Sequence, residues 1–254
     1  MKRHFCQAAI ASFGWVSAIA IASPALAATF TYSDSTFNEE DWELTTFTRG
    51  LGGSIFTQQF PDYGNDGEFM HVVNTVYPTP GVQDSWVIGV HRKTDAIYNP
   101  KTQGAIQSID FSEDSILFGG WYLGQSSGIA LWQDDRFYLA GGVGPQVESW
   151  TQKQQTNLQQ HDFFRYTDNP QNFLDFSING QPDFSENGSP IQFGFFRSNS
   201  VCQTCNAVAV HAGIDNWKVT VHTEDPPAST PEPSTLVGIL LLGFAATNCK
   251  RDRS

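Results

Sequence analysis

The chain has 254 residues and a formal net charge of −12 at pH 7, with 16% charged and 13% aromatic residues. The negative charge lies in the body of the chain, because residues 28–229 hold 24 acidic side chains against 9 basic ones. A surface of that sign repels nucleic acid and anionic lipid headgroups, so we exclude nucleic acid as a partner.

The first 27 residues have the pattern of a secretory signal peptide. Lys2 and Arg3 give a positive start, residues 5–22 are mostly apolar, and Ala25 and Ala27 are small residues at the end. Residue 28 is alanine, so a lipid-anchored cysteine is not expected there. The pattern predicts export through the general secretion machinery and cleavage after Ala27 by signal peptidase.

Residues 28–223 are predicted to form one β-sandwich domain. Apolar residues alternate with polar ones in stretches that begin at Trp86, Leu174, Ile191 and Trp217, and Gly- and Asn-rich turns separate such stretches. About a dozen short strands of this kind favour an all-β, antiparallel two-sheet sandwich, jelly-roll or concanavalin-like. Residues 151–161 are polar almost all round, and we expect a loop or one short helix there.

Two cysteines, Cys202 and Cys205, remain once both ends of the chain are removed. A single C-x-x-C pair lacks the other two ligands of a tetrahedral zinc site. Residues 206–210 resemble a strand, not the helix that follows a redox-active pair. The sequence therefore predicts a small structural disulfide.

The opening segment, residues 35–42, and the closing strand, residues 213–221, carry a resemblance. Alternation predicts that Asp215 shares the core face with Trp217. The Ile-Asp-Asn-Trp-x-Val-x-Val strand and the Phe-x-Glu-x-x-Trp opening are similar to the terminal strands of extracellular jelly-roll and concanavalin-like carbohydrate-binding modules. That resemblance implies a structural Ca²⁺ held by Asn38 or Glu40 together with Asp215. The alternatives are an Asp215 carboxylate capped by backbone amides and Asn216 acting as a turn residue.

A sugar site should pair an aromatic platform with acid or amide groups, because a pyranose has an apolar face and equatorial hydroxyls. Glycines flank one aromatic pair, and a second tryptophan precedes two acids where a hairpin turn is expected. The alternative use of each tryptophan is in the core. The candidate glycan-binding residues are Trp121, Tyr122, Trp132, Asp134, Asp135 and Trp150.

No catalytic residue is predicted. The Glu-x-Asp-x-x-Glu strand of concanavalin-like glycosidases, which sets two carboxylates on one face, has no match in the sequence. The histidines have neither the spacing of metal ligands nor a neighbouring nucleophile turn.

The chain ends in three successive segments after an extended linker, residues 224–230. They are Pro231-Glu232-Pro233, an apolar run that predicts a membrane helix at about residues 234–249, and the basic end 250–254. This order resembles the PEP-CTERM sorting signal of Gram-negative exported proteins. The resemblance implies that an exosortase cuts near Pro231-Glu232-Pro233, and the alternative is an ordinary membrane anchor.

The sequence thus favours a noncatalytic protein that is exported across the inner membrane, held transiently by its C-terminal helix, and delivered to the cell surface or extracellular matrix. Its sandwich is expected to bind exopolysaccharide or another glycan. The alternatives are a structural biofilm or matrix protein without a specific ligand and a divergent extracellular glycoside hydrolase.

Overall fold

The computed structural model describes residues 28–119, 124–142, 146–167, 174–175, 177 and 180–223. These residues lie within one compact unit, Ala27–Asp225. The signal peptide, the linker and the sorting tail that the sequence predicts lie outside the described residues. Within the described part of the chain, no helix has the length and apolar character needed to cross a membrane.

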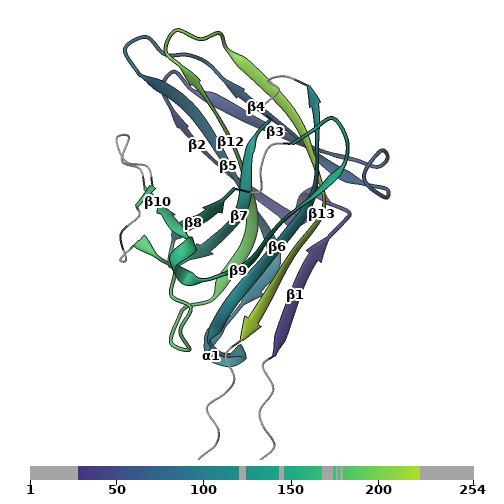
Figure 1. Ribbon diagram of the computed structural model, residues 1–254, viewed down its shortest axis with the longest axis vertical. Helices are drawn as coiled ribbons and strands as arrows, with labels where there is room; N and C mark the ends of the chain where they lie inside the picture. Colours follow the sequence, from purple (N-terminus) through teal and green to yellow (C-terminus); the bar gives the residue numbers. More distant parts are fainter. Residues whose placement is uncertain are drawn as a thin grey trace, which may run out of the picture. The chain divides into compact units, whose positions relative to one another are not determined.

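The domain is built from two antiparallel sheets, as the sequence predicts (Figure 1). The six-stranded sheet has the order β3-β4-β13-β6-β9, and β1 also pairs with β13. Its strands are β1 (Thr29–Asp34), β3 (Gly53–Phe60), β4 (Phe69–Val76), β6 (Ile106–Gly119), β9 (Thr151–Leu158) and β13 (Val208–Thr223). The longest of these, β13, lies at the centre of the sheet.

The seven-stranded sheet has the order β11-β10-β8-β7-β12-β5-β2. Its strands are β2 (Trp42–Arg49), β5 (Asp84–Tyr98), β7 (Ser126–Gln133), β8 (Arg136–Gly141), β10 (Phe164–Tyr166), β11 (Leu174–Asp175) and β12 (Ile191–Cys202). The helical elements in the described residues are single turns: η1 (Glu39–Asp41), α1 (Pro100–Gln103) and η2 (Gln160–Asp162).

The main core lies between the two sheets. Phe193 and Phe195 of β12 face Trp217, Val219 and other apolar side chains of the six-stranded sheet, and all are fully buried. Alternation along each strand supplies these residues, because every second side chain of a strand points to the same face.

A fully buried ion pair crosses this interior. Arg197 of β12 and Glu113 of β6 are both 0% exposed, and Arg197 Nη2 lies 2.9 Å from Glu113 Oε1. Burial raises the pKa of Glu113, and the charge of Arg197 offsets only part of that rise. The pair joins the two sheets through side chains of opposite charge.

The prediction of a loop or short helix at residues 151–161 is wrong for most of this segment. Residues 151–158 form the edge strand β9, which pairs with β6 from Ser115↔Thr151 to Ile109↔Leu158. The segment is almost entirely polar and has almost no alternation of apolar residues. It forms a strand because it pairs with β6 through backbone hydrogen bonds, and not because it buries an apolar face. Only the turn η2 is helical.

The predicted position of Asp215 on the core face is also wrong. A bulge shifts the pairing of β13 between Asp215 and Lys218, and Asn216 has a φ of 49°. The extra residue leaves Ile214 and Trp217 both in the core and turns Asp215 toward the loop after β3. There its carboxylate accepts from the backbone N–H of Asn65 at 2.6 Å.

Short-range features follow the sequence more closely. Cys202 and Cys205 form the predicted disulfide at the end of β12. Asp134 and Asp135, with φ of 51° and 58°, form the predicted two-residue hairpin turn between β7 and β8.

Candidate functional site: a groove on the seven-stranded sheet

The seven-stranded sheet carries a second apolar cluster on the face turned away from the core. Phe195 belongs to the core, while its neighbour Phe196 packs on the opposite face with Trp86 and Ile88 of β5 and with Phe137 and Leu139 of β8. An outer face of an antiparallel sheet is usually polar, so an apolar cluster there indicates a covered or ligand-binding surface.

The sheet curls around this outer face. Phe47 lies on β2 and Tyr166 on β10, with four strands between them in the sheet, yet their ring centroids are 4.0 Å apart. Phe47 also contacts Phe137 at 5.4 Å, and Trp86 lies 6.2 Å from Tyr166. The outer face is therefore concave, and its two sides meet at the rings of Phe47 and Tyr166.

Beside that meeting point the concave face is open as a groove of about 870 Å³. Its apolar lining comes from Trp86, Ile88 and Phe196 together with Leu139, Phe164 and Leu174 on the side of β8, β10 and β11. Its polar lining includes Asp84, Ser126, Ser198, Asn199 and Ser200. We call this cavity the groove.

Polar side chains fix the wall of the groove where β7 begins. Gln125 Nε2 donates to the carbonyls of Val72 and Val210 in the six-stranded sheet, both at 3.0 Å. Asn199 Nδ2 donates to the carbonyl of Gly124 at 2.9 Å. These buried and half-buried bonds tie the wall to the body of the domain, so this part of the groove is formed before a ligand arrives.

The groove combines the groups that a sugar needs. The Trp86 and Phe196 rings, which are 7% and 6% exposed, present a narrow apolar surface to the groove. The hydroxyls of Ser126, Ser198 and Ser200 can each donate and accept a hydrogen bond. Its volume is within the range of about 300 to 1,000 Å³ that is typical of ligand pockets. The arrangement therefore suits a small polyhydroxylated ligand with an apolar face.

The residues predicted to bind glycan are not gathered at one place. Trp121 and Tyr122 lie outside the described residues. Trp132 faces the concave side of the seven-stranded sheet, but the Arg92 guanidinium lies over its ring at 4.5 Å and Phe137 packs beside it at 4.5 Å. Asp134 and Asp135 are exposed in the turn that follows Trp132.

Trp150 lies with the other sheet. Its indole Nε1 donates to the carbonyl of Tyr63 at 3.0 Å, and its ring packs on Phe69 at 5.5 Å. A hollow of about 640 Å³ lies beside it on the outer face of the six-stranded sheet, lined mainly by rings: Phe60, Tyr63, Phe69, His71, Phe118 and His211. This lining offers fewer hydroxyl and amide groups than the groove does.

The residues proposed to hold Ca²⁺ take part in two different hydrogen-bonded clusters. Asn38 Nδ2 lies 3.4 Å from Asp41 Oδ2, and Asp215 bonds to the backbone N–H groups of Asn65 and Asn216. Among the residues that the structure describes, no three His, Cys, Asp or Glu side chains are placed to hold a metal ion. Asp215 has the backbone caps of the first alternative.

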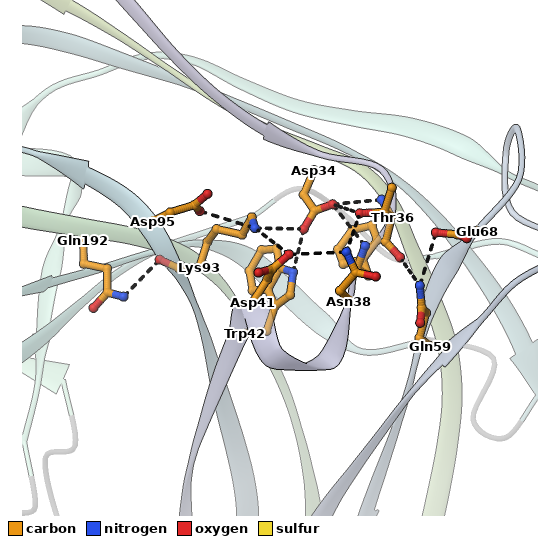
Figure 2. Close-up of polar contacts among 11 residues, drawn as sticks. Asp34, Thr36, Asn38, Asp41, Trp42, Gln59, Glu68, Lys93, Asp95 and Gln192 are labelled. Carbon is orange, nitrogen blue, oxygen red and sulfur yellow. Dashed lines mark hydrogen bonds and ion pairs between the residues drawn. The ribbon is translucent and has the colours of Figure 1, made fainter.

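A side-chain cation lies within the cluster around Asn38 (Figure 2). Lys93 Nζ lies 3.4 Å from Asp34, 3.4 Å from Asp41 and 3.3 Å from Asp95. Burial alone would lower the pKa of Lys93, but the three carboxylates outweigh it and raise that pKa. The ammonium group therefore stays charged and balances the acids at the start of the domain.

Asp34 is the best satisfied of these acids. Its Oδ1 accepts from the backbone N–H groups of Thr36 and Phe37, and its Oδ2 accepts from the Trp42 indole at 2.8 Å. Burial would raise the pKa of Asp34, but these donors hold it below its usual value. Asp34 thereby fixes the turn η1 and places Trp42 in the core.

Sequence reasoning missed most of the groove. Trp86 was identified as part of an alternating strand, but its assignment to the concave face depends on how the sheet curls. One signal was available in the sequence of β12. The polar run from Ser198 to Ser200 follows an apolar stretch of the same strand, so hydroxyl-bearing side chains replace apolar ones toward its C-terminal end.

No protein-family model matches the sequence, and no curated protein matches it. Among solved structures, the chain is similar to a family 11 carbohydrate-binding module from Clostridium thermocellum in complex with a β-1,3-1,4-mixed-linked tetrasaccharide. The TM-score is 0.45 at 16% identity, over 74% of this chain and 94% of that one.

A family 11 module of a cellulosomal cellulase from the same organism gives a TM-score of 0.46 at 16% identity, over 78% and 98% of the two chains. A xylan-binding domain from Paenibacillus barcinonensis gives 0.35 at 11% identity, over 76% and 94%. All three likenesses are distant, with identities of 11% to 16%.

Proposed function

We propose that the protein is an exported, noncatalytic β-sandwich that binds an extracellular glycan in the groove. The observation that supports this most directly is the pairing of Trp86 and Phe196 with three serine hydroxyls in a cavity of ligand size. Ring surface and hydroxyl groups together match the apolar face and the hydroxyls of a pyranose.

The charge of the groove favours a neutral glycan. Asp84 is the one charged side chain among the described residues that line it. The body around it is strongly acidic, with 24 acidic and 9 basic side chains between residues 28 and 229. Carboxylated or sulfated sugars would meet a field of their own sign, so exopolysaccharide built of neutral sugars is the expected ligand.

Blocking the groove tests this proposal. Ser200 is exposed on β12 and lines the groove, whereas Ser54 is exposed on β3 of the other sheet. Ser200→Trp is expected to abolish retention on immobilised host exopolysaccharide, and Ser54→Trp is the matched control that should leave retention unchanged. Equal retention of both variants would place the glycan elsewhere, and failure of the wild type to bind a glycan array would favour the structural matrix protein.

For localisation, we propose that the C-terminal tail directs exosortase processing after export. The Pro231-Glu232-Pro233 motif, the apolar run after it and the basic end support this through their resemblance to PEP-CTERM signals. Intact mass of the protein from surface, medium and membrane fractions tests it. A C-terminus near Pro233 in the surface or medium fraction is expected, and a chain that keeps Ser254 in the membrane fraction would make the tail a permanent anchor.

A further inference from the structure

The groove ends at a group of rings that fill the rest of the concave face. We call Phe47, Trp132, Phe137 and Tyr166 the aromatic plug. Neighbouring rings of the plug are 4.0 Å apart for Phe47 and Tyr166, 5.4 Å for Phe47 and Phe137, and 4.5 Å for Trp132 and Phe137. These distances are those of packed rings, which leave no room for a ligand between them.

A charged pair holds the plug in place. The Arg92 guanidinium lies 4.5 Å from the Trp132 ring and 5.6 Å from the Phe137 ring, and Arg92 Nη2 pairs with Glu43 Oε2 at 2.7 Å. Arg92 and Glu43 come from adjacent strands, β5 and β2, so the sheet itself supports this end of the concave face.

The plug lies directly at the inner end of the groove. Trp86 lines the groove, and its ring lies 6.2 Å from that of Tyr166. Tyr166, on β10, in turn contacts Phe47 on β2, the strand at the opposite edge of the sheet. Rings from strands at the two sides of the sheet thus meet across the concave face. A linear polymer that enters the groove from the side of Ser198 and Ser200 stops at this contact.

We infer that the groove receives the end of a glycan chain and not an internal segment of it. The inference rests on the proposed function and specifies its ligand: a terminal unit, or a short run of terminal units, of a neutral polysaccharide. Binding ends would hold the protein at chain termini and breaks, so the number of bound proteins would follow the number of chains and not their total length.

Counting chain ends tests the inference. The full-length protein is titrated by calorimetry with host exopolysaccharide, intact and after partial acid hydrolysis, at equal sugar mass. Chain ends are counted by a reducing-sugar assay. The number of binding sites per unit mass is expected to increase by the same factor as the number of ends. A site number per mass that does not change with hydrolysis would overturn end recognition and leave glycan binding standing.

Opening the plug gives a second measurement. In Phe47→Ala/Tyr166→Ala, the rings that meet across the concave face are removed, and the site number on intact polysaccharide is expected to rise toward that of the hydrolysed material. If the folded wild type binds neither intact nor hydrolysed polysaccharide, the proposed function and this inference are overturned together. If the double variant does not fold, the wild-type titration alone decides between ends and internal segments.

Discussion

His91 lies on β5 with its imidazole stacked on the Phe195 ring, at a centroid distance of 4.4 Å and an angle of 6° between the planes. Burial, together with the positive charge of the nearby Arg197 guanidinium, lowers the pKa of His91 to about 3. The folded chain therefore keeps this imidazole neutral at pH values where the unfolded chain, with a pKa near 6.5, takes up a proton.

Stability is consequently expected to fall with pH below neutrality. Between pH 6.5 and about 3 the unfolded chain binds one more proton at His91 than the folded chain does, which lowers the free energy of unfolding by about 1.4 kcal/mol per pH unit. Urea denaturation at several pH values measures this slope. His91→Phe keeps a ring on Phe195 and is expected to reduce the slope. An unchanged slope in that variant would assign the pH dependence to other groups, such as His71, whose pKa burial also lowers.

For single residues, the sequence predicted local features better than it predicted contacts between distant strands. The C-x-x-C pair and the Asp134-Asp135 turn could be predicted because their chemistry is local. The sequence could not show that Arg92 lies over the Trp132 ring. The two residues are 40 positions apart and come together only through the pairing of β5, β12 and β7.

Among the elements, the turn η1 depends most visibly on one side chain of another strand. Lys93 of β5 lies between Asp34, Asp41 and Asp95, and it is nearly buried. Removing its charge leaves the Asp34 carboxylate buried without a cation.

Lys93→Ala is therefore expected to lower the free energy of unfolding by about 1 to 3 kcal/mol, the usual penalty for a buried polar group that loses its partner. Thermal unfolding of Lys93→Ala, with Lys101→Ala on the exposed turn α1 as the control, measures it. Equal Tm values for the variant and the wild type would show that the cluster contributes little.

The elements that sequence analysis missed share a cause. β9 is a strand because β6 offers it a ladder, and the position of Asp215 is set by a bulge at Asn216; neither depends on apolar alternation. Strand segments that bury one face, such as Trp217–Val221 of β13, were recognisable because alternation is the signal that a sequence carries.

For the molecule as a whole, the Arg197–Glu113 pair is a fully buried charged link between the two sheets. Replacing one partner leaves the other buried and uncompensated, which typically lowers the free energy of unfolding by about 3 to 5 kcal/mol. Arg197→Met is expected to show that loss in urea denaturation, and Arg197→Met/Glu113→Leu is expected to recover much of it. A double variant as unstable as the single one would mean that the pair contributes more than charge compensation.

The all-β class and the two-sheet arrangement could be inferred from spacing and turns, but the groove could not. It exists because the seven-stranded sheet curls until Phe47 and Tyr166 touch, and these residues are 119 positions apart in a sequence that gives no sign of their contact. Curl is a sum of small twists over every strand, so it becomes visible only in the assembled sheet.

The pairing of β1 with β13 brings the two ends of the domain together. Thr29 lies opposite His222, and Ala28 N donates to Thr223 Oγ1 at 2.9 Å, so the chain enters and leaves at neighbouring points (Figure 1). A few residues would join these ends into a ring, and new ends could then be opened at the exposed Asp134-Asp135 turn. The same proximity allows the whole domain to be inserted as a cassette into a surface turn of another protein, where the host chain would continue from almost the point at which it was interrupted.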